Sequence, residues 1–210
     1  MPYVPIKLPP YATGDLLLLF EKTIDPIFRE VHSLLTVRRD DQGPKGSMQI
    51  PTAILLVAAA DGAAQFLIPG EKGIGERFVL FFKECYPWDK DPPDGMTTDQ
   101  AADFLWDKVR CPLFHRFGVI FESKLVHKYG NIFALQEAEL EKIEESATRP
   151  FSDPSIRQDS VRTVLWLETF YWGIRQAISR AIDTPEKAAR IQEWIASGKW
   201  DRKSKLSKRT

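Results

Sequence analysis

Apolar residues recur every three or four positions along most of the chain, which is the spacing of a helix with one buried face. In the first half this pattern predicts one helix over residues 14–38 and, after a polar loop, an Ala-rich helix that ends near residue 68. Two further helices are predicted over residues 75–86 and 97–109. A loop rich in proline and aspartate, residues 87–96, separates these last two.

The pattern changes past residue 111. Residues 119–127 and 132–135 flank the sequence KYGN and predict a β-hairpin. Charged residues over 136–146 indicate an exposed helix, and residues 156–182 carry the longest apolar stripe and predict the longest helix. A short helix over 184–197 follows. The fold class expected is therefore mainly α, a single helical bundle with a small β-hairpin excursion near residues 119–135.

Individual residues refine these boundaries. Proline lacks an N–H and clashes with the preceding helical turn, so Pro26 either kinks the first helix or begins a second one capped by Asp25. Thr97 and Gln100 have the spacing of a capping box, which predicts a helix start at this point.

Residues 50–68 are apolar over a length close to that of a membrane span. Asp61 stands near the middle, and a carboxylate at the bilayer centre costs about 2.5–3.5 kcal/mol. The segment is therefore interpreted as a buried helix of a protein outside the membrane. Asp61 can be an N-cap-like carboxylate, a carboxylate bonded within its own helix, or the partner of Arg110. Because a buried carboxylate without a partner is costly, a pair is the expectation.

Charge and composition narrow the classes of protein. The 210 residues carry 29 basic and 29 acidic side chains, which excludes a strongly basic nucleic-acid coat and an acidic disordered chain. Two cysteines are too few for a disulfide scaffold. No signal peptide is recognised at the start, so a cytoplasmic location is expected. We expect one domain over 1–198 and a basic, disordered tail over 199–210.

The segment from Arg110 to His115, RCPLFH, is the candidate for chemistry. An arginine offers a planar fork of donors that matches a phosphate, and a histidine can give or take a proton near neutral pH. Cleavage of RNA by its own 2′-hydroxyl needs a base, an acid and a cation on the phosphate, with no metal. One histidine cannot easily be both base and acid, whereas a two-fold dimer would supply two.

The sequence from Ala102 to His115, ADFLWDKVRCPLFH, resembles the signature of HEPN-type helical domains, which is an arginine followed after four to six residues by a histidine. It is most similar to an uncharacterised bacterial group with a Leu-Arg-(Asn/Cys)-x-Leu-Val-His pattern. Two upstream pieces fit this pattern: Ala60-Asp61-Gly62, and the aromatic segment RFVLFFKECYP over 77–87. The resemblance covers roughly residues 50–130.

This resemblance implies a helical protein that binds RNA or nucleotides. Active members of the family are metal-independent ribonucleases, often dimeric toxins or antiviral effectors, and others are inactive interaction modules. It implies Arg110 and His115 as catalytic residues, with Asp61 and Cys111 supporting them. The chain departs from active members at Cys111, where a polar residue, commonly Asn, helps to orient the site.

Further residues near the motif are candidates for nucleic-acid binding: Arg116, Lys124, His127 and Lys128. For the last three a solvated hairpin tip is the simpler interpretation. Each motif residue has a structural interpretation too. Arg110 can stabilise a helix C-terminus, and His115 can be a satisfied, half-buried histidine.

Three classes of function remain open: a ribonuclease, a catalytically silent helical interaction module, and a nucleotide or small-molecule binder without chemistry. No cofactor is expected, and the histidines and cysteines lack metal-ligand spacing. The expected partners are RNA or a nucleotide, a second copy of the chain meeting it through Trp166 or Trp172, and an antitoxin-type protein. No membrane partner is expected.

Overall fold

The computed structural model describes residues 3–36, 49–70, 72–116, 132–136, 154–158 and 162–199. Its helices are α1 (Gly14–Leu19), α2 (Asp25–Thr36), α3 (Gln49–Leu67), α4 (Ile74–Cys85), α5 (Thr98–Phe104), α6 (Cys111–Arg116), α9 (Leu167–Ala181) and α10 (Pro185–Ala196). Two turns of π-helix, η1 (Phe20–Ile24) and η2 (Leu105–Arg110), join α1 to α2 and α5 to α6. The strands are β1 (Ile132–Gln136), β2 (Ile156–Gln158) and β3 (Arg162–Trp166). The prediction of a mainly helical chain with a small β part is confirmed.

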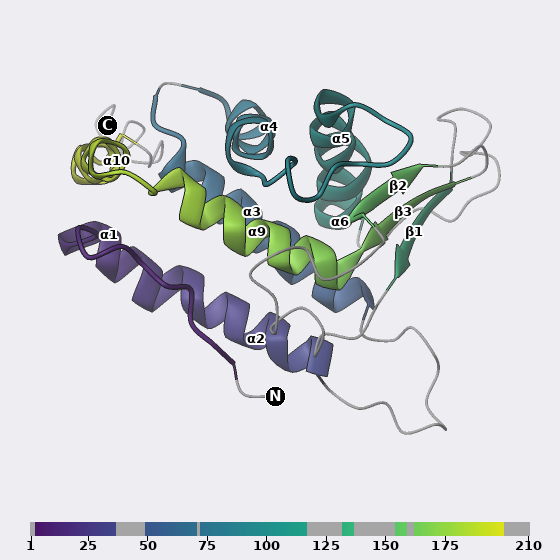
Figure 1. Ribbon diagram of the computed structural model, residues 1–210, viewed down its shortest axis with the longest axis horizontal. Coiled ribbons are helices and arrows are strands. Elements are labelled where there is room, and N and C mark those ends of the chain that lie inside the picture. Colours follow the sequence, from purple (N-terminus) through teal and green to yellow (C-terminus); the bar gives the residue numbers. More distant parts are fainter. Residues whose placement is uncertain are drawn as a thin grey trace, which may run out of the picture.

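Helix α3 lies at the centre of the fold. It contacts α2, α4, α9 and α10, and it also touches β1 and both π turns. Figure 1 shows α9 crossing the middle of the molecule beside α3, with α1 and α2 on one side and α4 and α5 on the other. The sheet lies at one end of α9 and α10 at the other. A helix that is apolar on all faces is stable only when neighbouring elements pack against those faces. The helices around α3, together with β1, do this.

The burial of α3 follows from its composition. Small residues on it are inaccessible to solvent and let neighbouring helices approach closely: Ala53, Ala60, Ala63 and Ala64. Among the described residues, no helix combines the length and the apolar character that crossing a membrane requires. The interpretation of residues 50–68 as a helix packed inside a protein is therefore consistent with its place in the fold.

The sheet differs from the sequence prediction. Its strand order is β1–β3–β2, with β1 parallel to β3 and β2 antiparallel to β3. The prediction of one helix over 156–182 is wrong for residues 156–158 and 162–166, which form the strands β2 and β3. The central strand β3 is buried on both faces, with Thr163, Val164 and Leu165 all at most 5% exposed. A strand covered on both faces has a continuous apolar run instead of a period of two, so it resembles a buried helix.

Of the predicted hairpin, residues 132–135 form strand β1, and residues 119–127 lie outside the described residues. The predicted helix over 136–146 also lies outside them, apart from its first residue, which ends β1. Within the described part of the chain, β1 pairs with β3. The basic tail lies outside the description from residue 200 onward.

Both π turns precede a proline. The N–H of Asp25 donates to the carbonyl of Phe20, and the N–H of Cys111 donates to that of Trp106, each five residues back. Pro26 and Pro112 come next and have no N–H to continue an α-helical ladder. A widened turn gives each ring room where an α-turn would clash with it, so the helix continues. The chain thus neither breaks nor starts a separately capped helix at Asp25.

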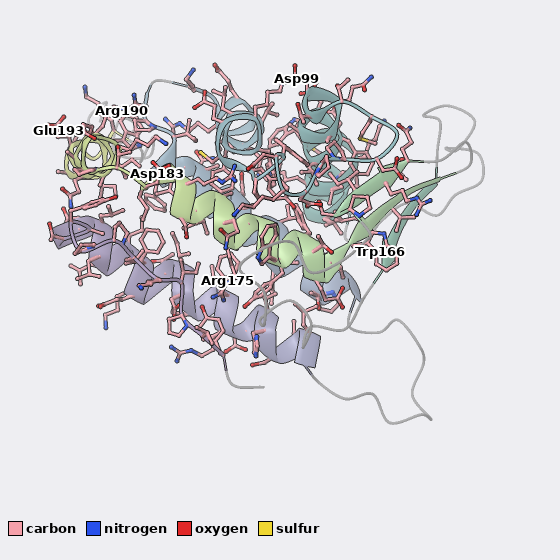
Figure 2. All side chains as sticks on the ribbon, in the orientation of Figure 1. Asp99, Trp166, Arg175, Asp183, Arg190 and Glu193 are labelled. Carbon is pink, nitrogen blue, oxygen red and sulfur yellow. The ribbon has the colours of Figure 1, made fainter. Side chains whose placement is uncertain are left out.

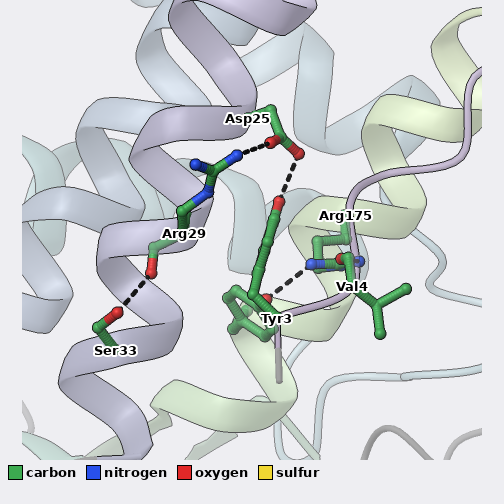
Figure 3. Close-up of polar contacts among 7 residues, drawn as sticks. Tyr3, Val4, Asp25, Arg29, Ser33 and Arg175 are labelled. Carbon is green, nitrogen blue, oxygen red and sulfur yellow. Dashed lines mark hydrogen bonds and ion pairs between the residues drawn. The ribbon is translucent and has the colours of Figure 1, made fainter. Parts of the chain in front are cut away.

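The N-terminal segment holds α2 against α9. The Tyr3 hydroxyl donates to Asp25 at 2.6 Å, and Arg175 of α9 donates to the Val4 carbonyl at 2.6 Å (Figure 3). Arg29 shares the Asp25 carboxylate at 3.3 Å. Burial raises the pKa of the Tyr3 hydroxyl, so it stays a donor to Asp25. Tyr3 bonds to α2 and Val4 to α9, so this end of the segment contacts both helices.

A buried polar cluster fixes the loop after α4. The Tyr86 hydroxyl lies 2.8 Å from Oδ2 of Asp91, to which it donates, and 2.9 Å from Oγ of Ser155. The backbone N–H of Ser155 donates to Oδ1 of Asp91 at 3.0 Å. The cluster joins the loop over 87–96 to the strand β2. It requires a glycine at 173 in α9, because a Cβ there would lie 2.0 Å from the Tyr86 hydroxyl oxygen.

Replacing Gly173 by alanine should therefore destabilise the fold by about 3 kcal/mol, at the upper end of overpacking costs, because Tyr86 must leave its partners. Urea unfolding of the two proteins measures this difference. The Gly62→Ala variant is the matched control, because a Cβ at Gly62 would meet nothing within 4 Å. Equal stabilities of the Gly173→Ala variant and the control would contradict this packing.

Two helix starts are as predicted. The Thr97 side chain accepts from the Gln100 N–H and the Gln100 side chain accepts from the Thr97 N–H, which completes the capping box. The Thr184 side chain accepts from the Lys187 N–H, with Pro185 in the first turn of α10. These local signals act within four residues, so tertiary packing does not override them.

Candidate functional site

An ion pair joins α3 to the end of η2. Nη2 of Arg110 donates to Oδ2 of Asp61 at 3.0 Å. The two side chains are only 14% and 19% exposed, so the pair is largely shielded from water. Its attraction is therefore stronger than that of a surface pair, and removing one partner would leave a poorly solvated charge. The pairing expected from the position of Asp61 in an apolar helix is confirmed.

The same guanidinium lies over an aromatic ring. Cζ of Arg110 is 4.7 Å from the centroid of the Trp106 ring, four residues earlier in η2. The indole also packs against Phe78 of α4, with the ring centroids 5.6 Å apart. Trp106 and Asp61 together hold Arg110 by a planar contact and a charged hydrogen bond, which fixes its orientation more closely than either would alone.

A second arginine, Arg77, bonds to α3 one helical turn after Asp61 and also lies over a tryptophan ring. Arg77 of α4 donates to Oε1 of Gln65 at 3.1 Å and to the Gly70 carbonyl at 2.7 Å, and its Cζ lies 4.9 Å from the Trp194 ring centroid. Arg77 is 3% exposed, and these two oxygens are neutral acceptors. Arg77 links α3, α4 and α10, so we interpret it as a structural residue. Arg110 differs, because it pairs with a carboxylate and its side chain is 14% exposed.

The motif itself crosses from η2 into α6. Arg110 ends the π turn, Cys111 begins α6, and the backbone of His115 lies within α6. The side chain of His115 lies outside the part of the chain that the structure describes. Five residues of α-helix turn through about 500°, so the Cα atoms at 110 and 115 lie about 140° apart around the axis.

The two cysteines differ in accessibility. Burial raises the pKa of the Cys85 thiol to about 12, and this side chain is in the core. Cys111, predicted to support the site, is partly exposed.

We expect iodoacetamide to modify Cys111 in the folded protein well before Cys85, because alkylation needs an accessible thiolate. Mass spectrometry of tryptic peptides over time would measure the two rates. Equal labelling of both cysteines in the folded protein would contradict the placement of Cys85, and labelling in urea provides the control.

The other residues predicted to bind nucleic acid have side chains outside the part of the chain that the structure describes. Arg116 belongs to α6 by its backbone, but its side chain lies outside the described part, and so do Lys124, His127 and Lys128 altogether. Among the described residues, no group of three or more His, Cys, Asp or Glu side chains could hold a metal ion. Asp61 and Arg110 are thus the two predicted site residues that the structure brings together.

One predicted contact surface needs correction. Trp172 was expected to face a second copy of the chain, but it is 6% exposed and belongs to the core of this one. Phe170 and Tyr171 are buried beside it. Trp166 is partly exposed and lies where β3 joins α9, near one end of the molecule (Figure 2).

Two residues of the site were not identified from the sequence: Trp106 and Gly75. Trp106 stands four residues before Arg110, a spacing at which helix neighbours touch, and this signal could have found it. Gly75 belongs to the site because a Cβ there would lie 2.6 Å from Cζ2 of the Trp106 ring. The sequence carries no signal for this contact, because it depends on which side chain of another helix approaches residue 75.

Comparison of the chain with models of known protein families, with curated proteins and with solved structures finds no match.

Proposed function

We propose that this chain is a HEPN-like protein that binds RNA and cleaves it without a metal ion, using Arg110 and His115. Arg110 binds a backbone phosphate and His115 moves a proton. The chemistry that this requires is limited to a base, an acid and a cation beside one phosphodiester, and these residue types can supply it.

The reaction balances within the RNA strand. An imidazole removes the proton of a 2′-hydroxyl, and the oxygen attacks the adjacent phosphorus. The bond from phosphorus to the 5′-oxygen of the next nucleotide breaks, and a second imidazole, as imidazolium, gives that oxygen its proton. The products are a 2′,3′-cyclic phosphate and a 5′-hydroxyl. Arg110 stabilises the charge that develops on the phosphate oxygens.

The observation that carries the proposal is the Asp61–Arg110 pair. A surface arginine has many rotamers, whereas Arg110 is held by a 3.0 Å bond to Asp61 and by the Trp106 ring at the start of α6. A guanidinium presents its N–H donors in a planar fork that matches the oxygens of a phosphate. An arginine fixed in this way, five residues before a histidine, has the features of a phosphate clamp that is oriented before its ligand arrives.

A homodimer completes the proposed site. One motif provides one histidine, while the reaction uses a base and an acid. The offset of about 140° between the Cα atoms at 110 and 115 gives a second reason, because the two positions leave the helix axis on different sides. Two copies related by a two-fold axis would place two motifs around one phosphodiester.

The test incubates end-labelled single-stranded RNA with the protein in EDTA and identifies product ends by mass spectrometry. We expect cleavage that leaves 2′,3′-cyclic phosphate, with single-stranded DNA of the same sequence uncut because it lacks the 2′-hydroxyl. Light scattering on the same sample gives the oligomeric state. A strictly monomeric protein that cleaves RNA would refute the two-histidine scheme, and a protein that cuts no RNA would refute the enzyme.

The second candidate is a silent helical interaction module. The observation in its favour is the burial of Arg110, which is 14% exposed and stacked on Trp106 in a way similar to the structural Arg77. In that case the role of the Asp61–Arg110 pair is purely structural: it holds η2 against α3. A dimer, or a complex with an antitoxin-type protein, without RNA cleavage would favour this second function.

A further inference from the structure

Gly75 lies under the ring that supports Arg110. A Cβ built on Gly75 would lie 2.6 Å from Cζ2 of Trp106 and 2.9 Å from its Cε2, closer than real Cβ contacts allow. The indole therefore lies directly against the backbone of α4. Since Gly75 is in a helix and has an ordinary backbone conformation, this close approach is the physical reason for a glycine here.

The indole has little freedom to move. Besides Gly75, it packs against the Phe78 ring of the same helix α4, with ring centroids 5.6 Å apart. Its ring carries the Arg110 guanidinium at 4.7 Å, and that guanidinium bonds to Asp61 of α3 at 3.0 Å. A shift of Trp106 away from α4 must therefore displace the guanidinium relative to Asp61.

We propose that Gly75 and Trp106 are positioning residues for Arg110: the missing side chain at 75 sets the depth of the indole, and the indole sets the orientation of the guanidinium toward the RNA phosphate. The part concerning RNA rests on the proposed function above. The part concerning geometry does not, because it states only that a side chain at 75 moves Arg110. Neither positioning residue touches the substrate in this scheme.

The test replaces Gly75 by alanine and follows Arg110 directly by NMR. A guanidinium over an indole has a side-chain N–H signal shifted upfield by the ring current, and Arg110→Lys identifies that signal by removing it. In Gly75→Ala the signal should move toward the ordinary arginine position, and the affinity for single-stranded RNA should fall. The Gly62→Ala variant is the matched control, because its Cβ meets nothing within 4 Å although it neighbours Asp61.

A second variant separates positioning from folding. Phenylalanine lacks the outer part of the indole that a Cβ at 75 would strike, so Gly75→Ala/Trp106→Phe should regain RNA affinity relative to Gly75→Ala alone. Trp106→Phe alone makes no overlap with residue 75 and tests the stack even if Gly75→Ala does not fold. It should shift the Arg110 signal and weaken RNA binding.

The outcomes distinguish the two claims. An Arg110 signal that moves in Gly75→Ala, in a protein that never binds RNA, would support the positioning role and refute the proposed function. An Arg110 signal and an RNA affinity unchanged in both Gly75→Ala and Trp106→Phe would overturn the positioning role. Loss of RNA affinity in Gly62→Ala equal to that in Gly75→Ala would also overturn it, because the effect would then not depend on the indole.

Discussion

Replacing His115 by alanine should lower the rate of RNA cleavage by about 10²–10⁴-fold, the usual contribution of a proton-transfer group. In the proposed mechanism the imidazole at 115 takes the proton of the 2′-hydroxyl or gives one to the leaving oxygen, and alanine can do neither. Single-turnover cleavage of labelled RNA measures this step without the effects of product release.

The His127→Ala variant is the matched control, because it removes an imidazole that takes no part in the proposed proton transfer. It should leave the rate at saturating protein unchanged. Melting curves of both variants check that the fold is kept. Cleavage that persists unchanged in His115→Ala would show that another residue or a contaminating nuclease performs the reaction.

Replacing Asp61 by alanine should destabilise the folded protein by about 3 kcal/mol, because it leaves the Arg110 guanidinium largely buried without its carboxylate. Arg110→Ala should cost a similar amount for the converse reason. The double variant should cost less than the sum, with a coupling energy of about 1–3 kcal/mol, as for residues in direct contact. Urea unfolding of the four proteins gives this cycle.

The pair between Lys83 and Asp103 provides the control. Its Asp103 side chain is 58% exposed and lies 3.7 Å from the lysine, so water screens the attraction. Asp103→Ala should change the stability by less than about 0.5 kcal/mol. A coupling energy near zero between Asp61 and Arg110 would contradict the shielded pair that the account requires.

The Asp61–Arg110 pair could be predicted from the sequence because a buried carboxylate is costly unless it is paired. A carboxylate in the middle of an apolar helix must find a donor, and Arg110 was among the partners considered. The capping box at Thr97 could be predicted because it closes within four residues. Both inferences depend on chemistry that the rest of the fold cannot easily change.

Other features depend on the fold itself. Thr163, Val164 and Leu165 were assigned to a helix because a strand covered on both faces loses its alternation. Trp172 was placed on a dimer surface because an aromatic residue on an apolar stripe looks the same whether it faces its own core or a partner. Pro26 left open a kinked helix or a second helix capped by Asp25. The structure has a π turn before it instead, an outcome that depends on how the segments before and after Pro26 pack.

Binding of an RNA phosphate by Arg110 can be measured separately from cleavage, by fluorescence anisotropy with an uncleavable strand. The probe is single-stranded RNA with methylated 2′-hydroxyls, titrated with wild type, Arg110→Lys and Arg77→Lys in EDTA. Lysine keeps the charge beside Asp61 but loses the planar fork, so Arg110→Lys should bind about tenfold more weakly or worse. Arg77→Lys should lower the melting temperature and leave the affinity of the folded protein unchanged. Wild-type affinity in Arg110→Lys, or no binding by wild type at all, would show that Arg110 does not bind the RNA phosphate.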